Sequence, residues 1–287
     1  MRIRVVTLNL LHGAPLPGKA RARRSLGTRL EWTREHLADV RPDVVLLQEA
    51  SISPRHGNVA ETLARALGLH VAWARANPTW LWRALGPRRL VGSLAFEEGP
   101  AILSRLPIVS HRVHRLSSSG NLVERRIALE AVLDGPTGRF SAFSVHLTAG
   151  SARGRRRQIA SLVRAVESSP HAHPVIVGGD FNADEGSHEL AHLMDRAGWI
   201  DSFRHLHPEA PGHTWGHALA DATVGAGRRI DFLFSAPAAG EHWRPAHSRL
   251  ILDRAFPRSE HGVLWASDHY GVITEFEAPP PRGADAR

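Results

Sequence analysis

The sequence contains no cysteine, which excludes disulfide bonds and thiolate metal sites but leaves the redox compartment open. It also has no apolar stretch approaching the length needed to cross a bilayer. The first apolar run extends only from Val5 to His12 and has no small-residue cleavage site. We therefore predict a strand there, no secretion signal and a cytoplasmic protein.

Lysine is nearly absent, because Lys19 is the only lysine among 36 basic residues. Arginine grips phosphate in a bidentate manner, so a preference for phosphate would explain this bias. A genome rich in G and C would give the same ratio, and we favour that explanation. The net charge of +8 still favours a polyanionic substrate.

The 287 residues, 43% hydrophobic and 22% charged, are typical of a globular protein. Short apolar runs predict buried strands at Ile3–Leu8, Val44–Leu47, Phe140–Val145, Val175–Val177, Ile230–Phe234 and Gly271–Phe276. Helical spacing and caps predict helices at 28–40, 58–68, 154–168 and 187–198. The order lacks strict βαβ alternation, which favours an α+β or layered fold. We predict one domain over 1–277 and a disordered tail over 278–287.

Polar side chains follow several of these runs. In PVIVGGDFN, Asp180 and Asn182 come directly after an apolar strand. Other polar residues occupy comparable places: Asn9, Glu49, His146, Asp231, Asp268 and His269. Burying an unpaired carboxylate costs roughly several kcal/mol, so carboxylates gathered at one rim need a compensating partner. Oxygen donors without thiolates suit Mg²⁺ or Mn²⁺.

The motifs TLN, LLQE, GPAILSR, SVHL, GGDFN, RRIDFLF and SDHYGV follow one another from Asn9 to His269. Each motif alone is a weak signal, but together and in this order the chain resembles the endonuclease/exonuclease/phosphatase superfamily. This superfamily includes DNase I-like nucleases, abasic-site endonucleases, neutral sphingomyelinases and inositol polyphosphate 5-phosphatases. The resemblance implies an α+β fold, a four-layer α/β/β/α sandwich of two mainly antiparallel sheets, and metal-dependent cleavage of a phosphoester.

The resemblance also implies a metal site. Glu49 matches the principal ligand of Mg²⁺ or Mn²⁺, with Asn9 and Asp268 beside it. A purely structural explanation is also available for each: Glu49 would be a turn residue, and Asn9 would cap the end of a strand.

Catalytic roles carry over in the same way. Asp180 matches the residue that orients and deprotonates the attacking water, and Asn182 matches a donor to a phosphate oxygen. His269 matches the histidine that contacts the scissile phosphate, steadied by Asp231. His146 matches the DNase I-like histidine, where abasic-site enzymes tend to carry tyrosine. The competing structural explanations are turn residues for Asp180 and Asn182, a core histidine for His146, and an ion pair with a neighbouring arginine for Asp231.

The HELAH segment at 188–192 fits the H-E-x-x-H motif of zinc proteases. No histidine follows at the extended metzincin spacing, so we interpret the segment as a chance match.

Specificity is predicted from other segments. Trp80 and Trp82, mixed with arginines, suit base stacking or a lipid interface, but a partly packed loop explains them equally well. Residues 17–25 read as a mobile basic loop, and Arg126 either faces the phosphate or flanks a strand.

The sequence thus predicts a monomeric phosphodiesterase of nuclease type, dependent on Mg²⁺ or Mn²⁺, with nucleic acid favoured as substrate. A phospholipid, phosphoinositide or inositol phosphate hydrolase is the alternative within the same chemistry, and a membrane lipid would then be the partner. A catalytically silent nucleic-acid-binding relative is the alternative of another class.

Overall fold

The computed structural model describes residues 2–12, 20–76, 97–120, 125–135, 138–169, 174–219, 227–237, 241–256 and 263–278. Trp80, Trp82 and residues 279–287 of the predicted tail lie outside these ranges. None of the helices formed by the described residues is long and apolar enough to span a membrane.

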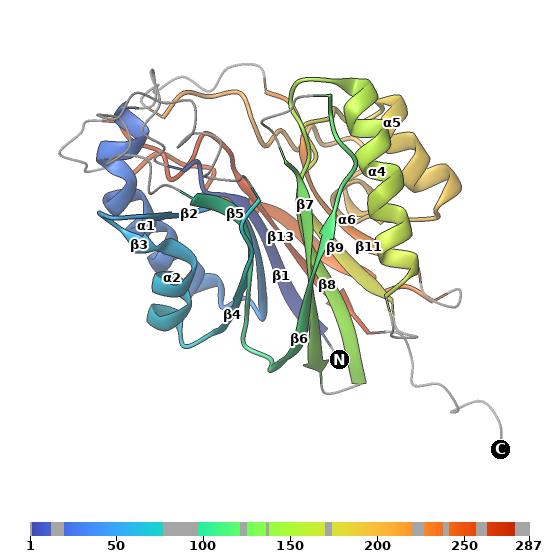
Figure 1. Ribbon diagram of the computed structural model, residues 1–287, viewed down its shortest axis with the longest axis horizontal. Helices are drawn as coiled ribbons and strands as arrows, with labels where there is room; N and C mark the ends of the chain where they lie inside the picture. Colours follow the sequence, from blue (N-terminus) through green and yellow to red (C-terminus); the bar gives the residue numbers. More distant parts are fainter. Residues whose placement is uncertain are drawn as a thin grey trace.

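Two sheets pack face to face (Figure 1). The first has the strand order β12 (Arg244–Ile251), β13 (Gly271–Glu277), β1 (Arg2–Asn9), β2 (Val44–Ser53), β5 (Glu97–Ser104) and β4 (His70–Trp73), with β3 (Gly57–Asn58) against β2. The second has the order β10 (Ile200–Asp201), β11 (Asp231–Ala236), β9 (Val175–Asp180), β8 (Gly138–His146), β7 (Ile127–Gly135) and β6 (Ile108–Arg115). The pairs β1–β2 and β8–β9 are parallel and the other pairs along both orders are antiparallel, which confirms the predicted mainly antiparallel sandwich.

Alternating side chains explain the four layers. On β1, Val5 faces the core between the sheets, whereas Val6 packs beneath the helices. On β9, Ile176 faces the inter-sheet core and Val177 faces the outer helices. Both faces of the central strands are therefore buried, which is why they appear in the sequence as continuous apolar runs rather than as strict alternation.

Helices α1 (Ala20–Val40) and α2 (Val59–Leu67) cover the first sheet, and α4 (Ala152–Glu167) covers the second (Figure 1). The predicted caps of α2 are confirmed: Asn58 accepts hydrogen bonds from two backbone N–H groups, and Gly68 has a positive φ of 66°. The predicted helix over 187–198 divides into α5 (His188–Ala191) and a π-helical turn, η2 (His192–Arg196). A short helix, α6 (Ser202–Leu206), follows β10.

The basic segment predicted as a mobile loop is partly helical. Helix α1 begins at Ala20, eight residues before the predicted start at 28. The predicted start of the helix and the predicted loop over residues 20–25 were therefore both wrong. Its buried face carries Arg29 and Thr33 among apolar residues, and this interrupts the apolar periodicity in the sequence.

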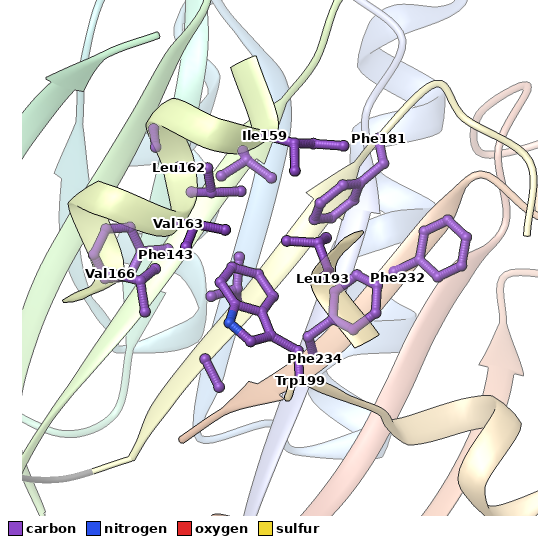
Figure 2. Packing of buried hydrophobic residues seen from close by; sticks show 14 of the residues in the cluster. Phe143, Ile159, Leu162, Val163, Val166, Phe181, Leu193, Trp199, Phe232 and Phe234 are labelled. Atoms are coloured by element: carbon purple, nitrogen blue, oxygen red, sulfur yellow. The ribbon is translucent and has the colours of Figure 1, made fainter. Parts of the chain in front are cut away.

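The second sheet holds the GGDFN segment through an aromatic cluster (Figure 2). Phe181 is fully buried and its ring lies edge-on to Phe232 and Phe234, with centroids 5.7 and 5.2 Å away. Leu162 and Val166 of α4 belong to the same cluster. Phe181 thereby anchors the two polar residues on either side of it.

Candidate active site

Strand register brings polar residues together at one edge of the sandwich. His146 lies opposite Asp180 in the parallel β8–β9 pair, and Asp231 lies opposite Asp180 in the antiparallel β9–β11 pair. Asn9 ends β1, and its amide reaches Asp180 from the other sheet. His269 lies just before β13 and completes the group.

Asp180 is the centre of this group and is almost fully buried. Its Oδ2 accepts a hydrogen bond from Nδ2 of Asn9 at 3.1 Å, and lies 3.4 Å from Nε2 of His146 and 3.8 Å from Nε2 of His269. Its Oδ1 accepts from the backbone N of Asn182 at 2.9 Å. Burial is the main reason that the pKa of Asp180 rises to about 7, because desolvation disfavours the carboxylate more than nearby His269 favours it.

His269 and Asp231 form a buried pair. Nδ1 of His269 lies 2.9 Å from Oδ2 of Asp231, and the other oxygen, Oδ1, has no hydrogen-bond partner among the described residues. Burial opposes the charged imidazole, but the carboxylates of Asp231 and Asp180 prevail and raise the pKa of His269 to about 10. The structural alternative, an ion pair of Asp231 with Arg228 or Arg229, does not occur among the described residues, since Arg228 binds Asp184 and Arg229 binds Asp201.

Glu49 occupies a β-bulge of β2 and has a positive φ of 55°. Its carboxylate accepts from the backbone N of His12 at 3.0 Å and from Nδ2 of Asn9 at 3.4 Å. Nε2 of His12 lies 3.3 Å from both Glu49 and Glu98. Burial alone would raise the pKa of Glu49, but the charge of His12 and the hydrogen bond from its backbone N–H hold that pKa well below its usual range. Glu49 therefore remains ionised.

The predicted metal ligands lie at this edge but are not equally placed. Asn9 and Glu49 are in direct contact, whereas Oδ1 of Asp268 approaches the group beside His269, 4.0 Å from Nε2. Oδ1 of Asn9 accepts from the backbone N of Leu11, and its second lone pair remains for a cation. Among the described residues, the side chains that converge closely enough to hold a metal are His12, Glu49 and Glu98, and Asp180, Asp231 and His269.

His146 and Arg126 lie on the side of the site next to Glu49. Together with Glu98 they line a small cavity. Burial, followed by the charge of Arg126, lowers the pKa of His146 well below its usual range, so its imidazole is neutral. Arg126 lines this cavity and also directly precedes β7 (Ile127–Gly135), so both of its predicted placements stay open.

Asn182 has a positive φ of 50°, a conformation that asparagine tolerates better than most residues. Its Nδ2 donates to the carbonyl of Leu147 at 3.0 Å, while its backbone N–H holds Asp180. One side-chain N–H of Asn182 is thus committed to the fold, and the amide group has a second.

Trp215 was not identified from the sequence, where it is a single aromatic residue outside any of the motifs. Its side chain is 37% exposed, and its ring centroid lies 6.5 Å from that of His269. The guanidinium of Arg228 lies 5.7 Å above the indole and pairs with Asp184. An aromatic face backed by a cation therefore borders the site.

The HELAH segment does not form a metal site among the described residues. His188 and His192 are exposed, and the chain passes from α-helix to a π-helical turn at the second histidine. Glu189 is buried in an ion pair with Arg155 at 2.9 Å. This agrees with the interpretation of the motif as a chance match.

Comparisons with solved structures show the same fold in distant proteins. The endonuclease/exonuclease/phosphatase from Bacteroides vulgatus has a TM-score of 0.72 at 18% identity, covering 97% of this chain and 100% of that one. D. rerio TDP2 complexed with a single-strand DNA product has a TM-score of 0.71 at 18% identity, covering 96% and 99%. The endonuclease/exonuclease/phosphatase from Beutenbergia cavernae has a TM-score of 0.68 at 21% identity, covering 98% and 72%. No curated protein matches the chain.

The family model for the endonuclease/exonuclease/phosphatase family matches residues 6–269, from the first motif, TLN, to His269 within the last, SDHYGV. The chain therefore belongs to the endonuclease/exonuclease/phosphatase family.

Proposed function

We propose that the chain is a Mg²⁺- or Mn²⁺-dependent phosphodiesterase of nuclease type that cleaves DNA or RNA by attack of water on phosphorus. The observation that carries this proposal is the environment of Asp180. This buried carboxylate is in contact with Asn9, His146 and His269 at the edge where the strands end. Such convergence of an acid, an amide and two imidazoles suits hydrolysis of a phosphoester.

The donors at this edge fit a hard divalent cation, because they are carboxylate and amide oxygens and because Glu49 stays ionised. Glu49, Asn9 and Asp268 would hold the cation. When bound, it supplies Lewis acidity and neutralises charge on the phosphate oxygens.

Asp180 orients the attacking water and accepts its proton. The amide of Asn9 and the backbone N–H of Asn182 fix the carboxylate from both sides, so its direction is set before substrate arrives. Asn182 offers its second side-chain N–H to a phosphate oxygen.

His269 contacts the scissile phosphate through Nε2, since its Nδ1 is bound to Asp231. The buried carboxylate favours the charged imidazole and fixes its orientation. His146 approaches the same region from β8, and Arg126 beside it adds positive charge that attracts phosphate.

Three features support nucleic acid as the substrate. The net charge is +8, and Trp215 exposes an aromatic ring beside His269 on which a base can stack. The similar structure of D. rerio TDP2 holds a single-strand DNA product.

The test uses purified protein with Mg²⁺ or Mn²⁺ on plasmid DNA, single-stranded and abasic oligonucleotides, RNA, sphingomyelin and inositol phosphates. We expect hydrolysis of DNA or RNA that is lost with a chelator and in Asp180→Ala. Asp195→Asn, an exposed acid on η2, is the control and should retain activity. Turnover of sphingomyelin or inositol phosphates alone would contradict the nuclease assignment, and salt-sensitive DNA binding without turnover would identify a silent relative.

A further inference from the structure

Arg29 is a cation in the interior of the protein. It lies on the inner face of α1, is 1% exposed, and makes all its observed hydrogen bonds to backbone carbonyls. Its Nη1 donates to the carbonyls of Leu10 and Ala266, both at 2.8 Å. Its Nη2 donates to the carbonyls of Leu11 at 2.8 Å and Ala22 at 3.1 Å. No carboxylate makes a direct hydrogen bond with it among the described residues.

Three of the four carbonyls belong to the two segments that carry the predicted metal ligands, and the fourth, that of Ala22, lies in α1 itself. Leu10 and Leu11 directly follow Asn9 at the end of β1. Ala266 precedes Asp268 by two residues, in the segment before β13. One guanidinium thus joins the backbone after the first strand to the backbone before the last.

We propose that Arg29 is a positioning residue of the cation site, which holds Asn9 and Asp268 at the separation that a single divalent cation requires. This inference rests on the proposed function, because it takes the cation site as given. Arg29 contacts neither the cation nor the substrate in this role, and it acts only through the backbone of the two segments.

The hydrogen bonds of Arg29 and its positive charge predict opposite effects on cation binding when the residue is replaced. The carboxylates of Asp268 and Glu49 both interact with the charge of Arg29, although burial dominates and lowers its pKa to about 10. A positive charge so near a cation site repels the cation, so removing it would tighten binding if charge were its only effect. Loss of the hydrogen bonds by which Arg29 clamps the two segments together would weaken cation binding instead. The direction of change in a neutral variant therefore separates the two explanations.

A lysine cannot replace the clamp. The planar guanidinium presents five N–H donors in a fixed fork, whereas the ammonium of lysine has three donors at one point. Arg29→Lys therefore keeps the charge but leaves buried carbonyls without donors. Both Arg29→Lys and Arg29→Gln should bind the cation more weakly.

The experiment measures Mn²⁺ binding by electron paramagnetic resonance and calorimetry in the full chain, without substrate. We expect a dissociation constant at least 10-fold higher in Arg29→Lys and in Arg29→Gln than in the wild type. Arg204→Lys is the matched control, since Arg204 also binds backbone carbonyls, those of His207 and Pro208, away from the cation site. It should lose thermal stability with an unchanged Mn²⁺ affinity.

Unchanged or tighter Mn²⁺ binding in the Arg29 variants would overturn the inference. Glu49→Gln separates this failure from failure of the proposed function. If the wild type and Glu49→Gln bind Mn²⁺ equally, or neither binds it, the cation site itself is refuted and the role of Arg29 falls with it.

A measurement on the wild type covers the case in which the Arg29 variants do not fold. On adding Mn²⁺, hydrogen exchange of the amides in 10–12 and 266–268 should slow by the same factor. Slowing of only one segment would contradict the clamp.

Discussion

Asp180→Asn should stabilise the metal-free protein while abolishing its activity. A pKa that rises from 3.8 to about 7 on folding means that the native state disfavours the carboxylate. The corresponding free energy is up to about 4 kcal/mol. Because the folded pKa lies above the unfolded one, this cost is absent below about pH 4, grows through about pH 7 and is constant above it. An amide has no such ionisation cost. Its single oxygen replaces only one of the two acceptors, Oδ2 facing Asn9 or Oδ1 facing Asn182, so about 4 kcal/mol is the upper limit of the gain.

Urea denaturation in the presence of a chelator measures the effect. We expect the free energy of unfolding of Asp180→Asn to exceed that of the wild type by up to about 4 kcal/mol at pH 8. The difference should shrink at pH 6 and vanish near pH 4. A variant that is no more stable than the wild type at pH 8, or a gain that is independent of pH, would refute the assignment of desolvation as the dominant effect on Asp180.

Three other substitutions test the electrostatics and the substrate contact. The arginines around Glu185 outweigh its burial and lower its pKa to about 2, so this stability is present above about pH 4.5 and lost as pH falls towards 2. Because solvent screens these partly exposed ion pairs, Glu185→Gln should cost about 1 to 2 kcal/mol at pH 7 and almost nothing near pH 2, measured by urea denaturation. Asp231→Asn should lower the pKa of His269 from about 10 by at least about 3 in the metal-free protein, because its Nδ1 lies 2.9 Å from Asp231 and an ion pair this close is worth at least about 4 kcal/mol. An NMR titration with an unshifted imidazole would contradict this. Trp215→Ala should raise KM for single-stranded DNA roughly 5- to 100-fold with kcat nearly unchanged, and an equal KM would exclude base stacking there.

The strands that carry the site were predictable because they are buried on both faces. Their apolar runs end abruptly, so a polar residue such as Asp180 or His146 at the end stands out. Strand β6 was not identified, because most of its residues are exposed and no apolar alternation marks it. Strand β4 is only four residues long and partly exposed, which leaves the same weak signal.

The site residues that were not predicted from the sequence were missed for a different reason. His12, Glu98 and Trp215 are single polar or aromatic residues, and nothing in their neighbours distinguishes them from other surface residues. Their contacts join segments far apart in the sequence, as when His12 after β1 meets Glu98 at the start of β5. Such pairs depend on strand register and on the bulge at Glu49, and neither is encoded in a local pattern.

The two glycines of GGDFN, Gly178 and Gly179, allow the close packing of strands and sheets at this strand end. A Cβ at Gly178 would lie 2.7 Å from Leu46 and 2.6 Å from Leu233, so the absence of a side chain lets the two sheets approach. A Cβ at Gly179 would lie 2.0 Å from the backbone oxygen of Val145, which cannot move without separating β9 from β8. The next residue pair along that ladder is His146 and Asp180. The close approach that only glycine allows is therefore also what sets the carboxylate of Asp180 against the imidazole of His146.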